Sequence, residues 1–389
     1  MPPLWQRCCQ SASGRENGGV DRTKKSASGG RPVTAGVNLL GLRSHNTALV
    51  LDLLRTAGTE GISRLELADR TGLTPQAVSK ITARLREEDL ATEAGHRAST
   101  GGKPRTVLRL VPEAGHALGV HLDRDELRAV LVDLDGTVVG ERCVAMDLGS
   151  GADAVVEGVA DLAEALLSVL RPRSVLGVGV ALPGPLDHGR GVLHRVTGFP
   201  EWDGFPLRDA LARRLGMPVA VDKDTNAAAL GLAVGDEADS FAYLHLGTGL
   251  GAGLVIGGKV HRGARTGAGE FGHQVIQLDG PPCDCGNRGC IEALCLGAVT
   301  RGDTETAARV LGAGAANLVG LLDIDVVLLG GRTVTAAPEL FVRGVQTALD
   351  DRAQGNGTVP VRLAPGGTRG VAEGAAQLLL APLFGRADG

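Results

Sequence analysis

The chain has 389 residues, of which 43% are hydrophobic and 22% charged, a composition typical of a globular protein with two or three domains. No apolar run reaches the length of a membrane span, and the Met1 end lacks a signal-peptide pattern, so we expect a cytoplasmic protein without a membrane partner. The net charge is −4, but residues 41–110 carry 11 basic and 8 acidic side chains, which permits a nucleic-acid partner without requiring one.

Residues 1–40 are rich in Ser, Gly, Arg and Lys and contain almost no periodic apolar pattern. Such a segment cannot bury enough apolar surface to offset the entropy of ordering it. We therefore expect a disordered tail; the alternative is that the segment results from an upstream start codon.

Residues 41–112 predict a winged helix-turn-helix domain. Apolar spacing and capping residues indicate three helices, the first from Asn46, the second from Ser63 and the third from Thr74–Pro75. Two strands are expected after them, at 90–93 and 106–110. The loop between these strands contains a glycine pair with Lys and Arg beside it, which is typical of a wing.

The third helix and the wing are the candidate DNA-binding surface. The predicted contacts are Gln76, Ser79, Lys80 and Arg84 on the helix, and Lys103 and Arg105 on the wing. The first three would read bases or phosphates from the major groove, and the wing residues would reach phosphates or the minor groove. The alternative is a small interaction domain whose outward charges are merely solvated.

Residues 113–389 have the pattern of a two-lobed α/β domain. Antiparallel strands come first and helices then alternate with strands, which favours two sheets with a cleft between them. We expect lobe 1 at about 113–225 and 371–389, and lobe 2 at about 226–370. The clearest predicted elements are helices 152–170, 207–215, 338–350 and 370–380, and strands 175–181, 241–246 and 326–329.

A glycine-rich segment, 267–292, combines four potential metal ligands with two carboxylates. The ligands are His273, Cys283, Cys285 and Cys290. Three thiolates and one imidazole make a tetrahedral zinc set, and because protein fills all four positions we expect a structural Zn²⁺. The alternative is a group of ordinary buried cysteines beside an unrelated histidine, which fits poorly with a loop full of Gly, Pro, Asp and Asn.

Several motifs within residues 113–389 point to the same protein family. They are LPGP at 182–185, DTNAAA at 224–229, the glycine-rich 247–253, GEFGH at 269–273, CxCGNxGCxE at 283–292 and LGG at 329–331. In these motifs the chain resembles the ROK family (repressors, open reading frames and kinases). The predicted winged helix-turn-helix at 41–112 resembles that of the family's transcription-factor branch. The resemblance covers roughly residues 41–380 and implies an actin-like, hexokinase-like (RNase H-like) pair of lobes.

The resemblance also implies a sugar site. The matching positions are Glu270, His273 and Glu292 as sugar contacts and Asp224 as the general base. Carboxylates that are held rigidly can each accept hydrogen bonds from two adjacent hydroxyls, and the zinc would hold both glutamates. The alternative is that Glu270 and Glu292 are solvated loop acids.

The chain departs from the family's kinases at the first phosphate loop. Where an Asp-x-Gly-Gly-Thr pattern belongs, His121–Asp125 offers no glycine or threonine, and Asp123 and Asp125 place negative charge there with only Arg124 to offset it. We therefore expect neither ATP nor Mg²⁺ to bind. A residual phosphate loop remains, formed by Gly247, Thr248, Gly249 and Gly251.

Two further departures from the family pattern concern the predicted sugar site and the segment after it. Lys223 stands where the family has a sugar-binding Asn, and it is placed to pair with Asp224 and lower the pKa of that carboxylate. We therefore expect Asp224 to be a relic base or a sugar contact, and no residue to be catalytic. Only 37 residues separate Glu292 from Gly330, so helices that form a dimer or close the cleft could be missing.

These features together predict a sugar-responsive transcriptional regulator, most simply a repressor of carbohydrate genes. A homodimer or higher homo-oligomer would bind a double-stranded operator, with a small sugar or sugar phosphate as effector. Two alternatives stay open: an ATP-dependent sugar kinase that retains a DNA-binding domain, and a constitutive DNA binder without a ligand.

Overall fold

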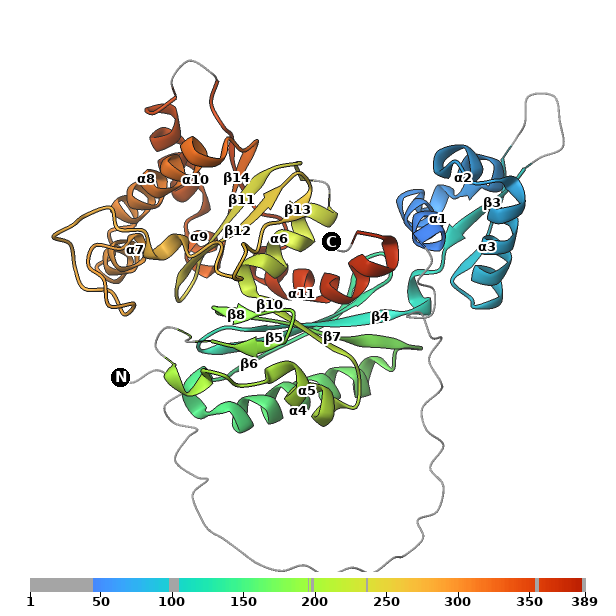
Figure 1. Ribbon diagram of the computed structural model, residues 1–389, viewed down its shortest axis with the longest axis horizontal. Coiled ribbons are helices and arrows are strands. Elements are labelled where there is room, and N and C mark those ends of the chain that lie inside the picture. Colours follow the sequence, from blue (N-terminus) through green and yellow to red (C-terminus); the bar gives the residue numbers. More distant parts are fainter. Residues whose placement is uncertain are drawn as a thin grey trace, which may run out of the picture.

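The computed structural model describes residues 45–97, 105–194, 196, 199–235, 237–353 and 357–386, so the predicted tail and Lys103 lie outside the described residues. A small N-terminal unit is followed by two larger lobes, each built on a five-stranded sheet (Figure 1). Among the helices of the described residues, none is long and apolar enough to cross a membrane.

The N-terminal unit is a winged helix-turn-helix. Its helices are α1 (His45–Thr56), α2 (Arg64–Thr71) and α3 (Pro75–Glu87), and its sheet has the order β1 (Ile62–Ser63), β3 (Arg105–Leu110), β2 (Ala91–Arg97). Ser63 and Glu66 form the capping box of α2, and the Thr74 side chain caps α3 with Pro75 in its first turn. The predicted helices and both predicted strands are confirmed. Strand β1 is an addition, because two residues carry no periodicity to detect.

Lobe 1 contains a sheet in the order β10-β7-β4-β5-β6. Its strands are β4 (His116–Leu122), β5 (Glu126–Asp133), β6 (Val138–Ala145), β7 (Val175–Leu182) and β10 (Val219–Lys223), with a small hairpin of β8 (Leu186–Asp187) and β9 (Val192–Leu193). Strands β4, β5 and β6 are antiparallel, and β7 runs parallel to β4 and β10. Helices α4 (Ala152–Leu170) and α5 (Leu207–Leu215) cover one face, and α11 (Gly370–Leu380) covers the other (Figure 1).

Lobe 2 contains a sheet in the order β13-β12-β11-β14-β15. Its strands are β11 (Phe241–Leu246), β12 (Leu250–Ile256), β13 (Lys259–Val260), β14 (Val326–Gly330) and β15 (Val361–Leu363). Helix α6 (Asp224–Val234) packs against this sheet, as do α7 (Ile291–Thr300), α8 (Thr304–Leu322), α9 (Arg332–Ala336) and α10 (Pro338–Asp350). The short segment after Glu292 therefore still holds two helices, α7 and α8.

The predicted phosphate loop at 247–253 is shorter than expected. Strand β12 begins at Leu250, so Gly251 and Gly253 lie in a strand and only 247–249 form a turn. A Cβ on Gly253 would lie 2.0 Å from the carbonyl oxygen of Thr225, so this glycine is needed for the packing of α6 on β12. A strand glycine that permits close approach of another backbone resembles a loop glycine in the sequence.

Close backbone contacts join the two lobes where α11 and α6 meet. A Cβ on Gly119 of β4 or Gly179 of β7 would lie 1.9 or 1.8 Å from a carbonyl oxygen of α11, so that helix lies directly on the lobe 1 sheet. A Cβ on Gly374 of α11 would lie 2.0 Å from the carbonyl oxygen of Ala227 in α6. The two helices therefore fix the relative position of the lobes.

The N-terminal unit is attached at the same place. Arg386 donates to Asp52 of α1 at 2.9 Å and to the carbonyl of Val234, at the end of α6, also at 2.9 Å. The guanidinium of Arg55 lies 4.7 Å from the ring centre of Phe384, in the 3₁₀ helix η9 (Ala381–Phe384) that follows α11. Helix α1 therefore contacts the segment that follows α11, and Arg386 of that segment links α1 to the end of α6.

Candidate functional site

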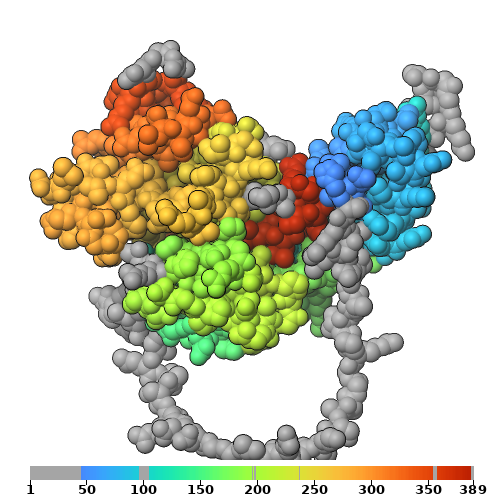
Figure 2. Space-filling view, viewed as in Figure 1, coloured from blue at the N-terminus to red at the C-terminus, as the bar shows by residue number. Residues whose placement is uncertain are grey.

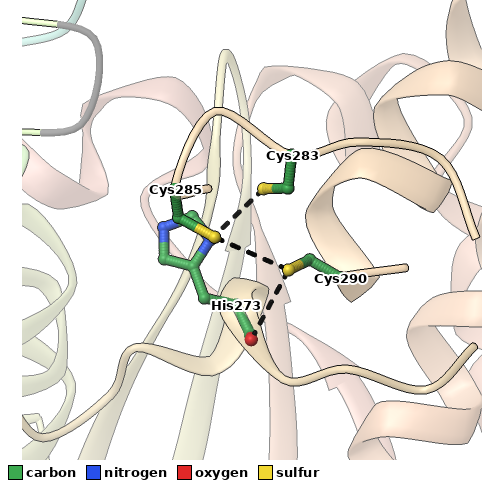
Figure 3. A group of neighbouring side chains, drawn as sticks. All are labelled: His273, Cys283, Cys285 and Cys290. Carbon is green, nitrogen blue, oxygen red and sulfur yellow. Dashed lines mark hydrogen bonds between the residues drawn. The ribbon is translucent and has the colours of Figure 1, made fainter. Parts of the chain in front are cut away.

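The four predicted metal ligands converge in lobe 2 (Figure 3). One ligand atom from each of His273, Cys283, Cys285 and Cys290 lies within 4.8 Å of the others. The Sγ atoms of Cys285 and Cys290 are 3.7 Å apart, and so are the Nδ1 of His273 and the Sγ of Cys283. Zinc–sulfur bonds of about 2.3 Å in a tetrahedron separate two sulfurs by about 3.8 Å, so the residues fit zinc.

Local backbone geometry explains why these residues meet. Gly286 and Gly289 have φ of +92° and +67°, which reverses the chain between the cysteines. A Cβ on Gly289 would lie 1.6 Å from the carbonyl oxygen of Gln277, and Val275 and Cys290 form a β-bridge. The loop is therefore held by its backbone, with the ligands facing inward.

The four candidate metal ligands are adjacent to a cleft between the lobes. His273 ends the 3₁₀ helix η7 (Phe271–His273), which begins directly after Glu270, and Glu292 lies in the first turn of α7. The Nδ1 of His273 faces the sulfurs, which leaves its Nε2 for the cleft that the residue also lines. The four residues of the predicted sugar site line one cavity of about 60 Å³: Asp224, Glu270, His273 and Glu292.

The predicted partner of Lys223 is wrong. Its Nζ lies 2.6 Å from Oε1 of Glu270 and donates to the carbonyl oxygen of Gly269 at 3.1 Å, so the ion pair is with Glu270 rather than Asp224. Lys223 is 8% exposed and ends β10, whereas Asp224 begins α6. The lysine therefore crosses the cleft and binds one of the predicted sugar contacts.

Lys223 lowers the pKa of Asp224 as predicted, but the predicted net shift of that pKa is wrong. Burial raises the pKa of Asp224, although His245 and Lys223 act in the opposite direction.

The carboxylate of Glu292 is buried and accepts a hydrogen bond from the backbone N–H of Leu250 at 2.7 Å. One candidate sugar contact is therefore fixed to β12, and the other, Glu270, is held by Lys223.

The phosphate half of the cleft is bridged by side chains of both lobes. Thr248 donates to Asp123 at 2.6 Å, and Arg332 of α9 makes ion pairs with both Asp123 and Asp125. The expectation that only Arg124 offsets these acids is therefore wrong, because the offsetting cation is Arg332. Burial opposes ionisation of Asp123, but His121, Thr248 and Arg332 together hold the pKa of its carboxyl well below the usual range.

Two histidines that the sequence did not single out as a pair lie beneath this bridge. The rings of His121 and His245 are 6.1 Å apart, and burial lowers the pKa of His121 to about 4. Nδ1 of His245 is hydrogen-bonded to the hydroxyl of Tyr243 at 2.9 Å. The residues are 124 positions apart, on β4 of lobe 1 and β11 of lobe 2, so only the packing of the lobes brings them together.

The candidate DNA-contacting side chains lie on one helix and one hairpin. Gln76, Ser79 and Lys80 are exposed on α3, and Arg105 is exposed at the start of β3. Arg84 is exposed as well, but its guanidinium donates to the hydroxyl of Thr47 in α1 at 2.7 Å. DNA contact by any of these residues stays a prediction.

The comparison with known proteins agrees with this geometry. The sequence profile described as the ROK family matches residues 117–306. A ROK hexokinase from Thermus thermophilus, known from its crystal structure, is 32% identical; the match covers 67% of this chain and 96% of the hexokinase, with a TM-score of 0.56. The chain belongs to the ROK family.

Two other similar proteins are described as a transcriptional regulator and as a repressor. A ROK-family transcriptional regulator, described as a homologue of the E. coli MLC protein, matches with a TM-score of 0.72 at 21% identity over 88% of this chain and 98% of its own, which shows a shared fold. The putative xylose repressor of Caldicellulosiruptor sp. (strain Rt8B.4) is 30% identical over 256 residues, or 64% of this chain and 63% of the repressor. The chain thus spans less than two thirds of that repressor's length.

Proposed function

We propose that this ROK protein is a DNA-binding transcriptional regulator that senses a small sugar and acts as a repressor of carbohydrate genes. Its parts would be a DNA-binding domain at 41–112 and a sensing body at 113–389. The observation that carries the proposal is the attachment of α1 to the segment that follows α11 and, through Arg386, to the end of α6. A change in the angle between the lobes would then reorient the winged helix.

The sugar site is the zinc-braced half of the cleft. Glu270, His273 and Glu292 of lobe 2 line the cleft together with Asp224, and they offer acceptors for several hydroxyls. A structural Zn²⁺ would hold His273, which follows Glu270 by three residues, and Cys290, which precedes Glu292 by two residues. Lys223 already binds Glu270 in this cavity, so an effector that uses Glu270 would have to displace Lys223 on entry.

The DNA site is the exposed face of α3 together with the wing. Gln76, Ser79 and Lys80 would enter the major groove, while Lys103 and Arg105 would contact phosphates or the minor groove. A homodimer would place two such units on a two-fold operator. The names of the xylose repressor and the ROK transcriptional regulator described above support this assignment.

The test is binding to duplexes from the region upstream of the protein's own gene. At matched salt, fluorescence anisotropy should give at least about 1,000-fold tighter binding than to a scrambled duplex of equal composition. One sugar of a panel should change that affinity, and Glu270→Gln should keep DNA binding while losing the response. Equal affinity for both duplexes would remove the regulator assignment, and no response to any sugar would leave a constitutive DNA binder.

A second candidate is an ATP-dependent sugar kinase that retains the DNA-binding unit. It is favoured by one observation, the raised pKa of Asp224, because a general base benefits from a pKa closer to neutrality. A coupled assay with Mg-ATP over a panel of hexoses decides the matter. Turnover that disappears in Asp224→Asn would establish the kinase, whereas absence of turnover for a sugar that binds would leave the sensor.

A further inference from the structure

A second cavity lies where the N-terminal unit meets both lobes. Its volume is about 220 Å³, against about 60 Å³ for the cleft. It is lined by α6, α11, the β5–β6 turn and the loop after β15, together with Arg55 of α1 and Tyr243 of β11. In Figure 2 the C-terminal segment that contributes α11 lies between the N-terminal unit and lobe 2. The proposed sugar response makes no use of this cavity.

Part of the cavity wall is bare backbone. Gly231 of α6 and Gly374 of α11 both line it, and a Cβ on Gly231 would lie only 3.0 Å from the Cα of Gly374. Gly235 and Gly370 line it as well. A molecule in the cavity would therefore touch the backbone of the two joining helices directly.

The charged side chains of the cavity are mainly acidic. Asp135, Glu237 and Glu373 line it, against a single guanidinium, that of Arg55. Within the part of the chain that the structure describes, Asp135 and Glu237 make no ion pair, whereas Glu373 pairs with Arg369 at 3.2 Å. Burial raises the pKa of Glu373, so an additional cation beside it would stabilise its ionised form.

One buried polar side chain also lines the cavity. Gln377 of α11 is 8% exposed, and its Oε1 has no hydrogen-bond partner within the described residues. A Cβ on Gly136 in the β5–β6 turn would lie 3.4 Å from its Nε2. A carboxamide at this depth is costly unless it is hydrogen-bonded, so an amide at the wall of a cavity indicates a polar occupant.

We propose that this cavity is a second small-molecule site, which takes a small hydroxylated amine. The excess of carboxylates attracts an ammonium group and repels anions, while the carboxamide and the backbone wall suit hydroxyl groups. The volume lies below the roughly 300–1,000 Å³ of pockets for drug-sized ligands, which limits the occupant to a small metabolite.

The cavity is connected to the sugar cleft and to the winged helix. Tyr243 lines the cavity, and its hydroxyl is hydrogen-bonded at 2.9 Å to Nδ1 of His245, which lines the cleft. Arg55 belongs to α1 of the N-terminal unit. An occupant would thus contact all three parts of the protein and stabilise one arrangement of them.

Three probes with the same carbon skeleton test the chemistry of the site. Saturation-transfer NMR on the full chain would compare 2-amino-1,3-propanediol (cationic), glycerol (neutral) and glycerate (anionic). The amine should bind saturably and at least tenfold more tightly than glycerol, and glycerate should not bind. The proposal is overturned if the amine fails to saturate or if glycerate binds as well as the amine.

Variants locate the binding. Asp135→Asn with Glu237→Gln should weaken amine binding at least tenfold, whereas Glu339→Gln, which removes an exposed carboxylate of α10, should leave it unchanged. Ala364→Trp should fill the cavity and abolish binding. Glu270→Gln should have no effect, and loss of amine binding in that variant would assign the amine to the cleft and refute the second site.

Discussion

The ammonium of Lys223 lies 2.6 Å from Oε1 of Glu270, so a lysine of lobe 1 occupies a carboxylate that the resemblance assigns to the sugar. A neutral sugar must therefore compete with an ion pair for this acceptor. Lys223→Asn should free Glu270 and increase the affinity for the best-binding neutral sugar by up to about fivefold, because an ion pair with an exposed partner contributes up to about 1 kcal/mol.

Calorimetry measures this affinity, and Lys259→Asn, at an exposed lysine of β13, is the matched control. A complete loss of binding in Lys223→Asn would contradict the prediction, because it would make the lysine itself a ligand contact.

Metal analysis should find a single zinc ion per chain. Cys285→Ser should reduce metal affinity at least tenfold and abolish sugar binding, because the glutamates on either side of the loop lose their support. Cys143→Ser, at an exposed cysteine of lobe 1, should change neither.

Loss of the metal should leave the winged helix folded, because α1 to α3 and their sheet lie outside lobe 2 and belong to another core cluster. After the metal has been removed with a chelator, the protein should still bind a random DNA duplex with the same dependence on salt concentration. Protein that contains no zinc when purified under metal-replete conditions would refute the metal site and the support it gives to the glutamates.

Arg332 should hold the lobes together. Its ion pairs with Asp123 and Asp125 cross the cleft, so Arg332→Ala should increase the radius of gyration in small-angle scattering and lower the free energy of unfolding by about 1 kcal/mol after solvent screening. Arg343→Ala, at an exposed arginine of α10, is the control. An unchanged radius in Arg332→Ala would show that the backbone contact of α6 with α11 alone sets the lobe angle.

Acid should destabilise the protein through His121. Burial lowers the pKa of His121 from the ordinary 6.5 to about 4, with Asp123 opposing this effect and His245, Arg128 and Arg332 adding to it. Between these pH values the unfolded chain binds a proton that the folded chain does not, so falling pH favours unfolding. The free energy of unfolding should drop by about 3 kcal/mol from this residue alone between pH 6.5 and pH 4.

Denaturant titrations at several pH values measure this slope. His121→Gln should flatten it, whereas His188→Gln, at an exposed histidine, should not. An equally steep slope in His121→Gln would assign the acid sensitivity to other groups.

The two kinds of DNA contact should respond differently to substitution. Gln76→Ala should reduce discrimination at one base position by about 1–3 kcal/mol while random duplex is bound as before. Lys103→Ala with Arg105→Ala should weaken binding to all sequences and reduce the salt slope by about 2. Anisotropy across a set of single-base operator variants measures both, and uniform weakening by Gln76→Ala would contradict the assigned roles.

Helices and strands with a strong hydrophobic periodicity were predictable from the sequence. Helices α4, α5, α10 and α11 and strand β11 have the predicted bounds, because each is an apolar pattern bounded by Gly, Pro or charged residues. The convergence of the four candidate metal ligands was predictable as well, since three cysteines and a histidine lie within a short stretch of the sequence. Strands β1 and β15 were not, because two or three residues acquire strand geometry only from a partner.

Partners distant in the sequence could not be predicted. Lys223 is adjacent to Asp224 in the chain and 47 residues from Glu270, so sequence proximity favoured the wrong carboxylate. Arg332 is 207 residues from Asp125 and follows a glycine pair at the end of β14, where nothing in the sequence indicates a contact with lobe 1. Both pairings result from the relative position of the lobes, which the glycine contacts of α11 determine.

The packing around Trp202 provides a spectroscopic probe. This residue is fully buried in lobe 1, donates from Nε1 to the carbonyl of Leu148 at 3.0 Å, and is one of only two tryptophans in the sequence. Its backbone N–H donates to the carbonyl of Phe199, whose ring lies 5.7 Å from the guanidinium of Arg124 at the cleft. With Trp5 replaced by Phe, the emission of this single indole would follow the entry of a ligand without any attached dye.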